Sequence, residues 1–417
     1  MSPRLERRNV ARALVGAGLI GHACFLPISI AGTQIALGVA AAGLLLDLPK
    51  PLRSPLDWPA LAFVLAAAGS DLLSPYGWPQ LAAATLWRAL LGFFIVFHGL
   101  GKAGDPRRAA LRLLDCVSAS IALAALVALL QYRTGFDPLH ALRLRPEALW
   151  VEAPGVPGRF GAMGFFTSRL TFGHVLTILL AFAAGALAAG GLRRRGAWLV
   201  AAATALGVAA VGVTFDRAAW LALGAAAIVI AAFSGRPARR ALAAALGALV
   251  LAAALQPAIR ARFTSGFSSS ANSDRVFIWS RALEIIRDHP LHGVGFANYP
   301  EICGRYYDRV DPGFFMRTWA HNLELSSLAE MGPLGLAALA WLLGAVLLAL
   351  VRGVRRAEPF ALGGLAAVSA WLVIAQVHDV LYDTKVMYAL WFAVAAGLRC
   401  YRNESGVGEA GCRDGNP

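Results

Sequence analysis

Long apolar stretches alternate with short polar connections along almost the whole chain. These stretches are rich in alanine and leucine, and they approach the length of about 20 residues that a helix needs to cross the hydrocarbon layer of a membrane. Backbone groups in lipid must be hydrogen-bonded within their own segment, so each stretch is expected to be an α-helix. The pattern predicts twelve spans, near residues 10–28, 32–48, 57–74, 82–100, 112–131, 171–190, 196–213, 216–233, 240–257, 328–351, 358–377 and 385–401.

Composition supports the same class of protein. Of the 417 residues, 58% are hydrophobic and 15% are charged, and the mean hydropathy is +0.61. A chain of this composition cannot present a soluble surface, whereas it suits repeated passage through a bilayer. We therefore expect an all-α polytopic membrane protein with about twelve transmembrane helices.

Positive charge predicts the orientation of the helices, because connections on the cytoplasmic side are rich in Lys and Arg. One alternating set of short connections carries nearly all of these residues: Arg4, Arg7, Arg8 and Arg12; Lys50 and Arg53; Lys102, Arg107 and Arg108; Arg193 to Arg195; Arg236, Arg239 and Arg240; Arg352, Arg355 and Arg356; Arg399 and Arg402. The opposite short connections, around residues 27–33 and 74–80, contain neither Lys nor Arg. Both termini are therefore predicted to be cytoplasmic, with residues 402–417 as a cytoplasmic tail.

Two connections on the predicted outer side are long. One covers about residues 132–170 within the first nine spans (residues 1–257), and the other, residues 258–327, precedes the last three spans (residues 328–401). Both are basic, with Arg133, Arg143, Arg145, Arg159 and Arg169 in the first and Arg260, Arg262, Arg275, Arg281, Arg287, Arg305, Arg309 and Arg317 in the second. Outer arginines suit a lipid-linked phosphate or an anionic lipid head group. Nucleic acid is not expected as a partner, because much of the net charge of +14 belongs to the cytoplasmic connections.

The second long connection is expected to contain short helices. A helix is predicted over residues 274–288, because Asn272 or Ser273 can cap it and His289-Pro290 ends it. Its apolar face is expected to consist of Val276, Trp279, Leu283 and Ile286. The glycines of Gly293-Val294-Gly295 then permit a tight turn. This connection is either a lid over a substrate or a structured cover for the helix ends.

The most informative motif lies where this connection meets the tenth predicted span. His321-Asn322 is followed by nine residues, Gly332, two residues and Gly335. This spacing matches the His-Asn-x9-Gly-x-x-Gly pattern of the O-antigen ligase family, which the chain resembles. Two shorter stretches also look like the family's loop pattern: Asp274-Arg275-x3-Trp279 and Gly293-x-Gly295-x2-Asn298-Tyr299. Gly332 and Gly335 are expected to allow close helix packing.

The resemblance implies an O-antigen ligase, a glycosyltransferase of the Gram-negative inner membrane with its site facing the periplasm. Its implied partners are undecaprenyl-diphosphate-linked O-antigen as donor, a sugar hydroxyl of lipid A core as acceptor, and membrane lipids. Such a donor already carries its leaving group. Catalysis then needs a base for the acceptor hydroxyl and positive charge for the departing diphosphate. No cofactor is expected.

His321 is the candidate base or acceptor-orienting residue, since imidazole titrates near pH 6.5. Without the motif, it would be interpreted as a capping or packing histidine. Asn322 is expected to position backbone or sugar hydroxyls. Arg217 is the first candidate ligand for the diphosphate, because it lies in the short outer connection Thr214-Phe215-Asp216-Arg217. It could equally pair with Asp216 or extend to the membrane interface.

Four more residues complete the set of candidates. Arg275 is assigned to the diphosphate by the resemblance. Arg88, near the outer end of the fourth predicted span, is a further candidate because an intramembrane arginine needs an anionic partner. Asp379 and Asp383, between the last two spans, could orient His321 or the acceptor, or they could be solvated turn carboxylates near Lys385.

The acidic residues do not suggest a metal site. Neither long outer connection contains an Asp-x-Asp triplet, and residues 27–33 include no carboxylate. We therefore predict a metal-independent reaction in which arginines supply the positive charge. One base and one leaving-group site suffice for direct displacement with inversion. The alternatives are an O-antigen polymerase, a protein O-oligosaccharyltransferase and, from a different class, a transporter of a lipid-linked substrate.

Overall fold

The computed structural model describes residues 3–48, 52–76, 83–137, 160–190, 196–264, 270–311 and 319–407. Within these ranges the chain forms α-helices and no β-strand, which confirms the all-α prediction. Most of the first long connection, residues 138–159, and the end of the tail, residues 408–417, lie outside the described residues.

Twelve long helices of the described chain coincide with the twelve apolar stretches, with ends that differ from the predicted ones by at most seven residues. They are α1 (Pro3–Phe25), α2 (Ile30–Leu46), α3 (Asp57–Leu73), α4 (Ala83–Lys102), α5 (Pro106–Thr134), α7 (Arg169–Gly190), α8 (Ala197–Gly212), α9 (Arg217–Phe233), α10 (Arg236–Leu255), α14 (Leu323–Arg355), α15 (Pro359–Ala375) and α16 (Thr384–Val407). By length and composition, α5, α7 and α14 could each cross a membrane, and α2, α8, α9 and α15 are apolar but shorter. The number of spans and their orientation remain predictions.

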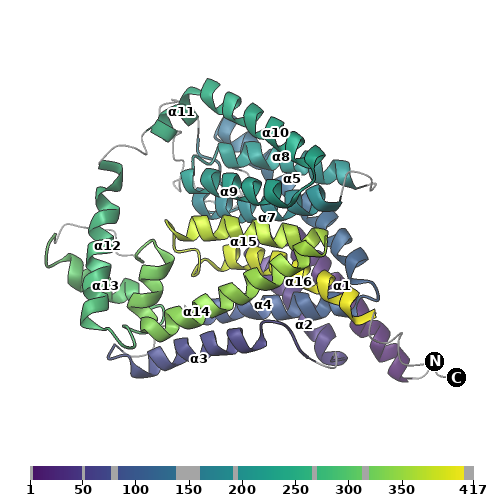
Figure 1. Cartoon of the computed structure of the whole chain (residues 1–417), viewed down its shortest axis with the longest axis horizontal. Coiled ribbons are helices and arrows are strands. Elements are labelled where there is room, and N and C mark those ends of the chain that lie inside the picture. The colour runs from purple at the N-terminus through teal and green to yellow at the C-terminus, as the bar shows by residue number, and fades with distance from the viewer. Residues whose placement is uncertain are drawn as a thin grey trace.

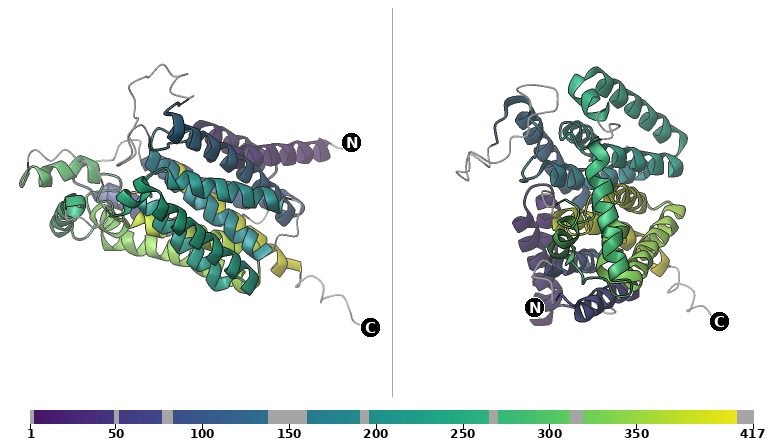
Figure 2. Two further views of the ribbon diagram at one scale, coloured as in Figure 1. Left: turned by 90° about the horizontal axis from the view of Figure 1, so that it is seen from above. Right: turned by 90° about the vertical axis from the view of Figure 1, so that its left-hand side faces the viewer.

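The long helices run side by side as one bundle, with both termini at one end (Figure 1). Three further helices, α11 (Pro257–Thr264), α12 (Ser270–Asp288) and α13 (Tyr299–Tyr307), lie between α10 and α14 in the sequence. The views of Figure 2 agree that α12 and α13 cover the end of the bundle opposite the termini. We call this end the outer end, in keeping with the predicted orientation.

The centre of the bundle is formed by α7 and α15, which pack against each other, while α15 also contacts α9 and α16. The two helices approach closely because Gly185 faces Gly363, and a Cβ at either position would overlap the backbone of the other helix. Small residues at such a contact allow tight helix packing in membranes. Helices at the periphery instead expose large apolar side chains, among them Ile35, Trp58 and Leu65. Apolar exposure of this kind suits contact with lipid.

Helix α14 is kinked near its outer end, where Gly332 has φ 65° and ψ −172° and is followed by Pro333. A Cβ at Gly332 would overlap the carbonyl group of Leu291. The carbonyls of Ala329 and Glu330, just before the kink, accept hydrogen bonds from the backbone of Val294 and Gly295 at 2.9 Å each. Gly332 was expected to allow two helices to pack closely. This expectation was wrong, because its close neighbour is the turn after α12.

The second long connection folds against this kinked segment. Helix α12 ends at Asp288, as predicted, but its buried face consists of Ile278, Ala282 and Ile285, which pack towards α13 and α14. Val276 and Leu283, which were expected on that face, are 63% and 52% exposed. Trp279 and Ile286, the other two residues of the predicted face, are half-buried against the same cluster, so the prediction was right in part and the buried face is shifted to one side of it.

Candidate active site

His321 immediately precedes α14, where the outer connection becomes helix. Asn322 caps this helix through its side-chain oxygen, which accepts a hydrogen bond from the backbone of Leu325 at 2.9 Å. His321 itself has φ 53°, in the left-handed region. A residue with a side chain loses about 1–2 kcal/mol in this conformation, so other contacts must hold it there.

Asp379 supplies those contacts. Its Oδ1 accepts a hydrogen bond from the backbone N–H of His321 at 3.0 Å and another from the hydroxyl of Ser326 at 3.1 Å. Its Oδ2 lies 2.5 Å from Nδ1 of the His321 ring. A carboxylate at Nδ1 favours the tautomer that carries its proton there, which leaves the lone pair on Nε2. The His321 ring therefore has a fixed orientation and one nitrogen available as a base.

Arg217 begins α9, a helix that packs against α15. The preceding residue, Asp216, caps this helix by accepting a hydrogen bond from the backbone of Ala218 at 3.0 Å. The Nη1 atom of Arg217 is buried and has no hydrogen-bond partner among the described residues. A buried guanidinium nitrogen without a partner is costly and suits an anionic ligand.

Two more arginines hold the turn that leads to Arg217. Phe215 has φ 56°, and its carbonyl accepts hydrogen bonds at 3.2 Å from Nη1 of Arg169 and from Nε of Arg262. Arg169 also donates to the carbonyl of Thr214 at 2.9 Å. Sequence reasoning counted both arginines among the outer basic residues but did not single them out, because their contacts are with backbone atoms distant in sequence.

Arg275, on α12, adds a further positive charge near this turn. Burial lowers the pKa of its guanidinium, and the charge of Arg217 lowers it further, whereas Asp216 and Asp379 raise it. Burial also lowers the pKa of Arg262, with Arg217 and Arg169 as the next causes. The side chains of Arg275 and Arg217 are thus close enough to repel each other. Such a group of guanidinium ions can bind phosphate oxygens through forked, charge-assisted hydrogen bonds.

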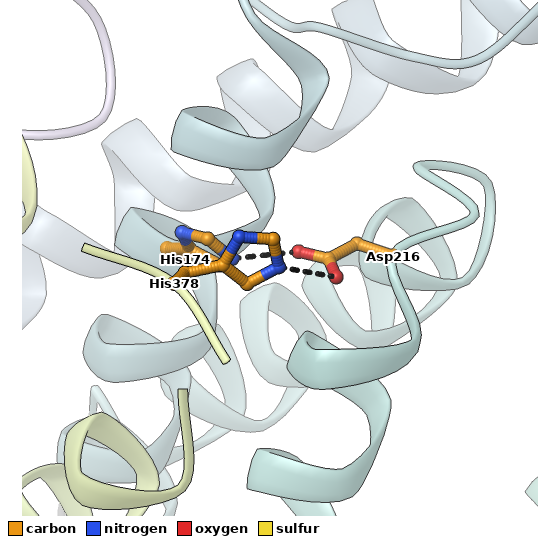
Figure 3. Close-up of side chains that lie close together, drawn as sticks. All are labelled: His174, Asp216 and His378. Carbon is orange, nitrogen blue, oxygen red and sulfur yellow. Dashed lines mark ion pairs between the residues drawn. The ribbon is translucent and has the colours of Figure 1, made fainter. Parts of the chain in front are cut away.

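A second group of side chains surrounds Asp216, the chain neighbour of Arg217 (Figure 3). His174 of α7 places Nε2 2.8 Å from Oδ2 of Asp216, and His378 places Nε2 3.9 Å from Oδ1 of the same carboxylate. The His174 and Asp216 side chains are 4% and 3% exposed. Burial lowers the pKa of His378 to about 3, with the charge of His174 as the next cause. Two imidazoles and a carboxylate at this spacing could in principle hold a metal ion.

The remaining candidates occupy other positions. Asp383 caps α16 through Oδ1, which accepts from the backbone of Lys385 at 3.0 Å, and its Oδ2 accepts from the hydroxyl of Thr171 at 2.7 Å. Arg88 is exposed on α4 and faces Tyr388 of α16. The structure therefore brings together His321, Asp379, Arg217 and Arg275, whereas Asp383 and Arg88 take part in different contacts.

His174 is the residue near the site that sequence reasoning missed. It lies in an apolar helix, 42 residues before Asp216 and 204 before His378, so no local spacing connects the three. The only signal was an ionisable side chain five residues inside an apolar stretch. Such residues in membrane helices usually face a partner in the protein interior.

The apolar helical bundle is that of a multi-pass membrane protein, and several arginines gather at its outer end. Residues 181–340 match the family model described as O-antigen ligase, and this segment contains Arg217, Arg275 and His321. The match confirms the resemblance of the chain to the O-antigen ligase family, whose members are glycosyltransferases of membranes. No curated protein matches the chain. The family implies a lipid-linked polysaccharide and a lipid acceptor as partners in general terms.

Proposed function

We propose that this protein is an O-antigen ligase of the Gram-negative inner membrane. It transfers O-antigen polysaccharide from undecaprenyl diphosphate to a sugar hydroxyl of lipid A core on the periplasmic face. The observation that carries the proposal is the pairing of a base held by Asp379 with a group of arginines at the same end of the bundle. One side of this site suits a hydroxyl, and the other suits a diphosphate.

The proposed chemistry is a single displacement. Nε2 of His321 accepts the proton of the acceptor hydroxyl as that oxygen attacks the anomeric carbon of the donor. The bond between this carbon and the diphosphate oxygen breaks, and both bonding electrons leave with the diphosphate. Arg217 and Arg275 stabilise the charge that develops on the leaving group. Attack opposite the leaving group inverts the anomeric centre, and no metal ion takes part.

The acceptor distinguishes this proposal from the related activities. A polymerase would pass the glycan to a second lipid-linked glycan, and a protein O-oligosaccharyltransferase would pass it to a Ser or Thr side chain. Two long helices, α15 and α16, follow α14 in the described chain. The choice of acceptor in the transfer assay distinguishes these three activities.

The test is transfer by purified, reconstituted protein from a defined undecaprenyl-diphosphate glycan to purified lipid A core. We expect product with the wild type and a loss of at least a hundredfold with His321→Ala, because general-base catalysis typically contributes about 10²–10⁴ in rate. A matched control is His98→Gln, which alters a buried histidine of α4. Undiminished transfer by folded His321→Ala would remove this histidine from the chemistry. Movement of donor across the bilayer without bond formation would instead identify a transporter.

A further inference from the structure

His174 has no part in the chemistry proposed above, although it is buried beside the site. Its imidazole touches the carboxylate of Asp216, the residue that caps α9 and directly precedes Arg217. The same carboxylate faces His378, which is the chain neighbour of Asp379 (Figure 3). Asp216 therefore meets one side chain from α7 and one from the turn after α15, two segments that are far apart in sequence.

A direct contact explains this group better than a shared metal ion. Two ligands of a tetrahedral zinc ion stand about 3.4 Å apart when each bond is close to 2.1 Å. Nε2 of His174 lies 2.8 Å from Oδ2 of Asp216, which is closer than two ligands that share such an ion. Oδ1 of Asp216 is already engaged by the backbone of Ala218.

The charges around the group also oppose a bound cation. The negative charge of Asp216 acts on the guanidinium groups of Arg169, Arg262 and Arg275. Arg217 follows Asp216 directly in the chain. A divalent ion on Asp216 would remove the carboxylate that offsets these cations and would add two positive charges beside them.

We propose that His174 is a positioning residue, whose Nε2 contacts the carboxylate of Asp216 and thereby fixes the start of α9, from which Arg217 binds the donor diphosphate. We call this contact the clamp. The ring of His378 lies against that of His174, 4.7 Å between centroids, on the same side of the carboxylate. Because Asp379 follows His378 in the chain and holds His321, the clamp also fixes the spacing between the arginines and the base. This inference rests on the proposed function for the identity of the anion.

Three substitutions of His174 separate a hydrogen-bonding role from a packing role. His174→Gln places an amide N–H close to the position of Nε2, His174→Asn places one close to Nδ1, and His174→Leu supplies none. We expect His174→Gln to keep a donor KM near that of the wild type. His174→Asn and His174→Leu are expected to raise it about tenfold, because each leaves a buried carboxylate without its donor. The KM for the acceptor is expected to stay the same in all three.

A second readout does not depend on transfer. Binding of undecaprenyl diphosphate without sugar, measured on detergent-purified protein, should weaken by the same factor in His174→Asn and remain unchanged in His174→Gln. His98→Gln is the control for altering a buried histidine elsewhere. If the wild type binds this lipid but transfers no glycan, the proposed function fails while the clamp remains supported.

Two results would overturn the clamp. One is a folded His174→Asn or His174→Leu protein whose donor KM and lipid binding equal those of the wild type. The other is a transition metal found by elemental analysis at about one ion per chain in the wild type and absent from His174→Gln. Because Gln and Asn differ by one methylene group, their comparison remains informative if His174→Leu does not fold.

Discussion

Asp379→Asn is the substitution whose effect the structure defines most sharply. Oδ1 of Asp379 accepts two hydrogen bonds, one from the backbone of His321 and one from the hydroxyl of Ser326. The amide oxygen of an asparagine must take this position, because an NH₂ group there would face two donors. Its NH₂ group is then turned towards Nδ1 of the His321 ring.

This arrangement forces the wrong tautomer on the histidine. A donor opposite Nδ1 requires the lone pair on that atom, so the ring proton moves to Nε2, and Nε2 can no longer accept a proton from the acceptor hydroxyl. The equivalent change in the Ser-His-Asp hydrolases lowers kcat about 10⁴-fold. We therefore expect Asp379→Asn to lower kcat for glycan transfer by about 10³–10⁴, with little change in the donor KM.

The assay is transfer to lipid A core at saturating donor, with thermal unfolding in detergent as the test of folding. Asp288→Asn provides a matched control, because this carboxylate of α12 accepts a hydrogen bond from the hydroxyl of Tyr306, in the packing between α12 and α13. A folded Asp379→Asn protein that retains more than a tenth of wild-type kcat would refute the tautomer argument.

Three further outcomes follow from the site and the fold. Arg217→Lys and Arg275→Lys are each expected to lower kcat/KM for the donor about 10–100-fold in the transfer assay, because lysine cannot reproduce the forked contact with phosphate; equal activity would exclude such contacts. Addition of EDTA to purified protein is expected to leave the transfer rate unchanged, and an absolute requirement for a divalent ion would contradict the proposed mechanism. Gly332→Ala is expected to lower the unfolding temperature, because a Cβ there meets the Leu291 carbonyl and the residue has φ 65°; an unchanged transition would show that the kink relaxes freely.

The helices were predictable from the sequence because a bilayer imposes a simple rule on length and polarity. Arg217 was identifiable for the same reason, since it stands out in a short outer connection that is otherwise free of basic residues. The start of α14 was also predictable, because a polar segment gives way to an apolar one at Asn322.

Other parts of the site depend on contacts that leave no local pattern. The hydrogen bonds of Arg169 and Arg262 end on backbone carbonyls, which any residue could supply. The contact of His174 with Asp216 depends on how α7 and α9 pack. The buried face of α12 was predicted only in part, because only tertiary packing selects which of its apolar residues are buried.

The kink of α14 has a consequence for how the protein responds to its membrane. Hydrogen bonds to Ala329 and Glu330 fasten the turn after α12 to the outer segment of this 33-residue helix. We expect this turn and the outer segment of α14 to move together. His321 lies just before the start of that segment. Bilayers of different thickness tilt their helices to different degrees. We therefore expect the rate of transfer to depend on acyl-chain length in reconstituted vesicles, because bilayer thickness changes the tilt of the helix next to His321.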